Sequence, residues 1–162
     1  MLYNSTLRAA RFLAVLVAAV GLLTLTPSAN EAAHASGVTR TERVDHALRI
    51  ALSKQGDPYV YGAAGPNAFD CSGLTSFAFH RAGFIHLPRT AAAQAGFVRH
   101  ISRHHMRVGD FVFFTSGGHV YHVGVFDGWH HHRRIIVHSP RPGERVRREA
   151  IWTSSWFAGT LR

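Results

Sequence analysis

The sequence contains a single cysteine, Cys71, among its 162 residues. One cysteine cannot form a disulfide within the chain, so the fold has to depend on its hydrophobic core. Such a cysteine is a small buried hydrophobe, a partner for another chain or a reactive thiol. Its position alone leaves all three interpretations open.

Acidic residues are also scarce, with nine against eighteen basic residues and a formal net charge of +9. A surface of this kind favours polyanions such as nucleic acid, anionic lipid or acidic wall polymers. The sequence lacks zinc-finger spacing, a phosphate-binding loop and a single-stranded RNA signature, so we expect no specific nucleic-acid partner. Anionic wall polymers remain candidate partners for the basic surface.

The longest apolar run is too short for a comfortable membrane span, which needs about 20 residues. It covers residues 12–25, follows Arg8 and Arg11, and precedes an Ala-His-Ala sequence at 33–35. This order predicts a signal peptide over 1–35, and hence a secreted or wall-associated protein. The alternative is an uncleaved membrane anchor.

The remaining chain has the length and composition of one globular domain, which we place at 44–162 after a short linker over 36–43. Apolar residues at helical spacing predict a helix over 44–52, with Thr41 as its cap. A second helix should begin near Cys71. Strands should follow at 111–114, 120–126 and 134–138, with a turn at Asp127-Gly128. Helices that precede strands indicate an α+β fold.

Cys71 lies after a loop rich in glycine and proline, in the first turn of the second predicted helix. The positive end of a helix favours a thiolate, which is the nucleophilic form of cysteine, so we expect an acidic thiol. Backbone N–H groups at the same place are suited to an oxyanion. Asp70 is placed to cap this helix and Ser72 adds a further donor.

Nucleophilic cysteines need a nearby base, usually histidine, and a group that orients it. Strand alternation predicts that His119 and His122 point to opposite faces, so that only one of them meets Cys71. His138 ends the next predicted strand. If the two strands pair, His138 can lie beside His122 and orient it.

Six short motifs occur in an order that closely resembles the NlpC-type cell-wall peptidases, a papain-like family. They are Gly-Asp-Pro-Tyr-Val-Tyr-Gly at 56–62, Phe-Asp-Cys-Ser-Gly-Leu at 69–74, Leu-Pro-Arg-Thr at 87–90, Val-Gly-Asp-Phe-Val-Phe-Phe at 108–114, His-Val-Gly-Val-Phe at 122–126 and Val-His-Ser-Pro at 137–140.

The resemblance implies a papain-like fold, in which a helical half carries the nucleophile and packs on an antiparallel sheet. It implies that Cys71 is the nucleophile, His122 the general base and His138 the orienting residue. It also implies cleavage of D-γ-glutamyl–diaminopimelate or related bonds in peptidoglycan stem peptides, without metal or cofactor. We expect the protein to be a monomer. Two alternatives stay open: an acyltransferase or amidase on the same fold, and a non-catalytic wall-binding protein.

Other polar residues have competing interpretations. Asp70 and Ser72 either bind the free amine of the substrate or serve only to cap the helix. Arg89 either meets a substrate carboxylate or forms a structural salt bridge. Asp110 is expected to cap a turn. The thirteen histidines include runs at 104–105 and 130–132, which we interpret as solvated loop residues rather than metal ligands.

Overall fold

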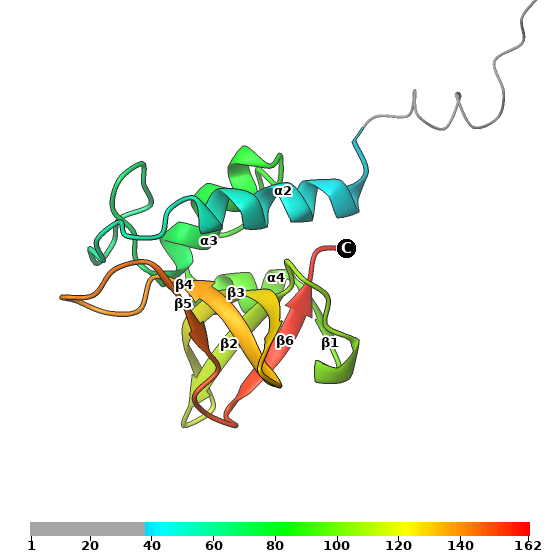
Figure 1. Ribbon diagram of the computed structural model, residues 1–162. Helices are drawn as coiled ribbons and strands as arrows, with labels where there is room; N and C mark the ends of the chain where they lie inside the picture. The colour runs from blue at the N-terminus through cyan, green and yellow to red at the C-terminus, as the bar shows by residue number, and fades with distance from the viewer. Residues whose placement is uncertain (1–37) are drawn as a thin grey trace, which may run out of the picture. The chain divides into compact units, whose positions relative to one another are not determined.

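The computed structural model describes residues 38–162 (Figure 1). In this part of the chain, helices come first and six strands form one antiparallel sheet in the order β1-β6-β2-β3-β4-β5. The elements are α2 (Arg40–Leu52), α3 (Cys71–Arg81), α4 (Ala91–Phe97), β1 (Arg99–Ile101), the 3-10 turn η1 (Arg103–His105), β2 (Phe111–Ser116), β3 (His119–His130), β4 (Arg133–His138), β5 (Arg147–Ala150) and β6 (Trp156–Thr160). This arrangement confirms the predicted α+β class.

Helix α2 begins earlier than expected. Its N-cap is Thr39, not Thr41, and the side chains and backbones of Thr39 and Glu42 form a reciprocal capping box. The segment 36–43, expected as a linker, therefore includes the first helical turn. The predicted signal peptide over 1–35 lies outside the described residues. Within residues 38–162, no helix has both the length and the apolar character of a membrane span.

The sheet has an apolar core on each face. On one face, Phe111, Phe113 and Val123 pack with buried residues of α2, α3 and α4. On the other, Phe114 packs with Trp156 and the side chains around it. Successive residues of a strand point to opposite faces, which explains why the run at 111–114 is buried throughout. Each fully buried phenylalanine contributes about 1.5–3 kcal/mol, so this strand is a main anchor of the fold.

Strand β3 is longer than predicted and contains two bulges. Its pairing register shifts once against β2, leaving Tyr121 as an extra residue, and once against β4, leaving Asp127 as another. The turn expected at Asp127-Gly128 is therefore a bulge inside the strand. The chain reverses instead at His131 and His132, which both have positive φ angles (46° and 62°). A bulge adds a residue without ending a strand, which explains the wrong prediction.

Strands β1 and β5 have no strand-like pattern in the sequence and were not predicted. β1 is only three residues long, and β5 consists of Arg-Arg-Glu-Ala. Both lie at the edges of the sheet. Short, charged edge strands lack the apolar alternation by which strands are recognised in a sequence. β5 nevertheless contributes side chains to the site described next.

Candidate active site

Cys71 is the first residue of α3, as predicted, and is partly buried. Asp70 caps the helix by accepting the Gly73 N–H at 2.6 Å. A Cβ atom at position 73 would lie 2.0 Å from the carbonyl oxygen of Ala63. Only glycine therefore allows the first turn of α3 to pack against the preceding loop. In the Asp-Cys-Ser-Gly sequence, the aspartate cap and the glycine thus together hold the thiol at the start of this helix.

Arg89 forms a structural salt bridge with Asp70, the N-cap of α3. Its two terminal nitrogens donate to the two oxygens of Asp70 at 3.0 and 2.7 Å, and one also donates to the hydroxyl of Ser72 at 3.1 Å. Burial alone would raise the pKa of Asp70, but hydrogen bonds from Arg89 and from the N–H groups of Gly73 and Gly62 hold that pKa below its ordinary value.

Asp70 and Ser72 are therefore parts of a structural network around the nucleophile. Neither is among the residues that line the pocket at Cys71. Asp110 likewise has structural contacts, since it accepts the Arg107 N–H at 2.7 Å and the Thr160 hydroxyl at 2.6 Å. Binding of a substrate amine by Asp70 and Ser72 stays a prediction.

The bulge at Tyr121 changes which face of the sheet the side chains of the two candidate bases point to. Phe114 pairs with His122, and Ser116 pairs with His119. Because Phe114 and Ser116 are two residues apart in β2, they and their cross-strand partners share one face. The prediction that His119 and His122 point to opposite faces is therefore wrong. They differ in position instead: His119 is exposed at the hairpin end, whereas His122 is buried and lines the pocket.

His122 and His138 form a buried pair on adjacent strands. Nε2 of His122 lies 2.8 Å from Nδ1 of His138, and the two side chains are 5% and 1% exposed. Gly124 makes room for the pair. A Cβ atom there would lie 2.8 Å from the Ile136 side chain and 3.3 Å from the Cβ of His138. The expected pairing of the two strands is thus what joins the histidines.

A carboxylate continues this chain of contacts. Nε2 of His138 lies 3.1 Å from Oε2 of Glu149 in β5. The same oxygen accepts hydrogen bonds from Nε and Nη2 of Arg147 at 3.1 and 2.8 Å. Sequence reasoning missed both residues because their strand carries no strand-like pattern. The alternation of Arg147 and Glu149, two residues apart, was the only available signal.

Burial lowers the pKa of His122 to about 3, with the neighbouring His138 adding to the effect and Glu149 opposing it. Burial also lowers the pKa of His138 to about 4, with Arg147 as the second cause. Both imidazoles are therefore neutral at neutral pH.

The thiol does not have the expected acidity. Burial raises the pKa of Cys71, and the nearby Asp70 adds to this, while backbone N–H groups of Val123 and Ser72 oppose it. The helix end does favour the thiolate, as expected, but desolvation outweighs it. The resting site consequently holds a neutral thiol beside a neutral imidazole.

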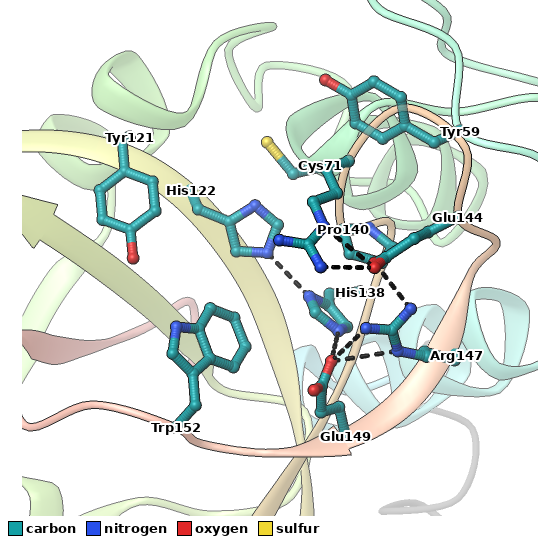
Figure 2. Close-up of a pocket in the computed structure, with 11 residues that line it drawn as sticks. Tyr59, Cys71, Tyr121, His122, His138, Pro140, Glu144, Arg147, Glu149 and Trp152 are labelled. Carbon is teal, nitrogen blue, oxygen red and sulfur yellow. Dashed lines mark hydrogen bonds and ion pairs between the residues drawn. The ribbon is translucent and has the colours of Figure 1, made fainter.

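These residues line one pocket of about 460 Å³ (Figure 2). Figure 2 shows the ring nitrogen of His122 that does not bind His138 turned toward Cys71. Trp152 lies beside the histidines and stacks on Phe114, with ring centroids 4.2 Å apart. The lining residues are Tyr59, Cys71, Tyr121, His122, His138, Pro140, Arg141, Glu144, Arg147, Glu149 and Trp152.

Among residues 38–162, no three His, Cys, Asp or Glu side chains lie close enough together to bind a metal ion. The site's chemistry rests on a thiol, two imidazoles and a carboxylate. Together these can deliver a nucleophile, accept its proton and orient the acceptor, which is the equipment of a cysteine hydrolase.

The model of the NlpC/P60 family matches residues 56–161 of the chain. The chain belongs to the NlpC/P60 family. This membership confirms the resemblance found in the motifs, and with it the papain-like fold. The matched range includes Cys71, His122, His138 and Glu149.

Curated relatives of this NlpC/P60 chain carry endopeptidase names. A probable endopeptidase, Cgl2188, of Corynebacterium glutamicum is 47% identical over 78 residues, which are 48% of this chain and 36% of the relative. The bifunctional muramidase/DL-endopeptidase CwlT of Bacillus subtilis is 42% identical over 85 residues, 50% of this chain and 26% of the relative. The chain thus spans about a third or less of these relatives.

A solved structure of an NlpC/p60 domain shares the fold. The domain of the peptidoglycan hydrolase SagA matches with a TM-score of 0.64 and 28% identity, over 73% of this chain and 98% of that one. Family membership and these relatives place the chain in a family of peptidoglycan hydrolases.

Proposed function

We propose that this chain is a secreted cysteine endopeptidase that hydrolyses amide bonds in peptidoglycan stem peptides. The single observation that carries the proposal is the meeting of Cys71 with the coupled pair His122 and His138 in one pocket. A protein that only bound the wall would have no need for a thiol, a buried base and a partner for that base in one pocket.

The chemistry follows from the neutral resting state. As Sγ of Cys71 attacks the substrate carbonyl carbon, His122 accepts the thiol proton at its nitrogen facing the sulfur. Backbone N–H groups in the first turn of α3 stabilise the oxyanion. The C–N bond then breaks as His122 returns the proton to the leaving amine. Water, deprotonated by the same histidine, then adds to the thioester carbon. The C–S bond breaks, the carboxylic acid leaves, and His122 returns the proton to the sulfur.

Several features support a stem-peptide substrate. The names of the relatives include a DL-endopeptidase and a peptidoglycan hydrolase. The pocket wall carries both charges, with Arg141 and Arg147 on either side of Glu144. Stem peptides carry both carboxylates and amines, which such a wall can pair with. The bond between D-γ-glutamate and diaminopimelate is the specific bond that we propose.

We also propose that the basic surface contacts anionic wall polymers. A second hollow, of about 420 Å³, is lined by Arg99 and Arg107 together with His100 and His105. Both arginines are exposed. Exposed arginines attract phosphate-rich polymers in a salt-dependent way. Retention on purified walls that falls with added salt, and further with Arg99→Ala and Arg107→Ala, would support this contact.

The deciding experiment is digestion of purified muropeptides by the protein and by Cys71→Ala, with products identified by mass. Hydrolysis at one stem-peptide amide by the native protein alone supports the proposal. Transfer of an acyl group to an added amine without hydrolysis indicates an acyltransferase. Binding without any product indicates a wall-binding protein. N-terminal sequencing of exported protein tests removal of residues 1–35.

A further inference from the structure

A line of hydrogen-bonding groups crosses three adjacent strands, from His122 in β3 through His138 in β4 to Glu149 in β5 (Figure 2). The pairing register places all three on one face of the sheet. Glu149 pairs with Ile136, which shares its face with His138, and Arg147 pairs directly with His138. The line is therefore built into the register of the sheet.

The end of this line fixes the direction of every hydrogen bond in it. A carboxylate that is paired with a guanidinium is ionised and can only accept. Nε2 of His138 must then donate to Glu149. Since this imidazole is neutral, its Nδ1 has no proton and accepts from Nε2 of His122. The neutral His122 is left with an unprotonated Nδ1, the nitrogen that Figure 2 shows turned toward Cys71.

We propose that Glu149 is a positioning residue for this site: through His138, its carboxylate holds His122 in the tautomer whose free nitrogen receives the proton of Cys71. The role rests on the proposed peptidase function for its consequence in catalysis. The tautomer itself does not depend on activity and can be tested separately.

Arg147 makes the arrangement persistent. It donates twice to the oxygen of Glu149 that faces His138, and once to Glu144 at 2.7 Å. Glu149 and Arg147 are both partly exposed, so without this pairing the carboxylate would gain hydration by turning outward. The ion pair at the edge strand therefore keeps an acceptor at the histidine pair.

The first test is the nitrogen NMR spectrum of the imidazoles, which separates protonated from unprotonated ring nitrogens. In the native protein, both His122 and His138 should show a protonated Nε2 and a bare Nδ1. In Glu149→Ala, His138 should lose this preference and populate both tautomers. Glu149→Gln retains an oxygen acceptor and should retain the native pattern. Native spectra with a protonated Nδ1 on either histidine would overturn the proposal.

The second test is kinetic and uses a purified stem peptide. Glu149→Ala should lower kcat about tenfold or more, by analogy with the 10–100-fold losses seen when the hydrogen-bond partner of a metal-binding imidazole is removed. KM should stay within about twofold because the carboxylate is committed to His138 and Arg147. Glu149→Gln should recover most of the lost kcat.

Asp127→Asn provides the matched control. Asp127 in β3 forms an ion pair with Arg148 in β5. Asp127→Asn therefore also removes an ion pair that holds β5, but it leaves the contacts of His138 unchanged. Its kcat should be native. An equal loss of kcat in Asp127→Asn and Glu149→Ala would show that β5 acts only as a scaffold. A native kcat in Glu149→Ala would show that Glu149 does not position the histidines. Either result would overturn the proposal. If the native protein cleaves no peptide, the proposed function fails while the NMR result still decides the tautomer.

Discussion

At the scale of single residues, the site is governed by desolvation. His122 and His138 are almost completely buried, and Cys71 is partly buried beside them. In such surroundings each charged form is disfavoured, which lowers the pKa of an imidazole and raises that of a thiol. The helix N-terminus at Cys71 acts in the opposite direction and does not prevail. Charge on Cys71 and His122 therefore develops only when a substrate is attacked.

This balance predicts the titration of Cys71. Its alkylation by iodoacetamide should show an inflection above the ordinary thiol pKa of about 8.5, because burial raises the pKa of Cys71. Labelling rates measured from pH 6 to pH 10 on native protein provide the test, with a free cysteine peptide as control. An inflection well below the ordinary value would mean that a thiolate–imidazolium pair exists at rest.

The positions of the two candidate bases predict different effects of substitution. His122→Ala should lower kcat about 100-fold or more, the usual contribution of a general base, while circular dichroism remains native. His119→Ala should keep native kcat, because this side chain is exposed at the hairpin end and outside the pocket. A comparable loss in both folded variants would contradict the assignment of His122.

The two contacts of His138 predict which replacement is tolerated. Its ring accepts on one side and donates on the other. Glutamine can do both through its oxygen and its nitrogen, whereas alanine can do neither. We expect His138→Gln to retain clearly more kcat than His138→Ala, measured on the same stem peptide. If both variants are inactive, or both match the native protein, orientation must come from another residue.

At the scale of the elements, β3 shows what the sequence could and could not predict. The strand, its buried histidine and the pairing with β4 follow from apolar alternation and spacing. The bulges at Tyr121 and Asp127 depend on how residues pair across strands, which a single sequence does not record. The start of α2 differs: Thr39 stands three residues before Glu42, a capping-box signal that identifies the cap from sequence alone.

The hairpin between β3 and β4 predicts a gain in stability. His131 and His132 both have positive φ angles, which asparagine and glycine adopt more readily. The double change His131→Asn and His132→Gly should stabilise the protein by about 1 kcal/mol, measured by urea unfolding. Relief of left-handed backbone strain, about 1–2 kcal/mol per residue, outweighs the unfolded-state entropy that glycine adds, about 0.5–1 kcal/mol. His104→Asn, a change in the exposed turn η1, serves as control and should alter stability little. If the hairpin variant is less stable, the contacts of these histidines contribute more free energy to folding than their positive φ angles cost.

At the scale of the whole molecule, the proposed catalytic groups lie where the helical layer meets the sheet, and folding is linked to their protonation. The motifs predicted Cys71, His122 and His138, because each is marked by its neighbours in sequence. Glu149 and Trp152 entered the site only through the fold, by way of an edge strand and a segment without a motif. The three predicted residues share one pocket only because α3, β3 and β4 bury them together.

That burial predicts a loss of stability in mild acid. The folded-state pKa values of His122 and His138, about 3 and about 4, lie below the unfolded value of about 6.5. As pH falls below about 6.5, His122 and His138 bind protons in the unfolded chain but not in the folded protein. The free energy of unfolding therefore decreases from neutral pH toward pH 4. Each histidine removes at most about 1.4 kcal/mol per pH unit. Urea unfolding at pH 7, 6 and 5 should show this decline, and His138→Gln should reduce its slope. Stability that is constant from pH 7 to pH 5, or a slope unchanged in His138→Gln, would contradict the link between burial and protonation.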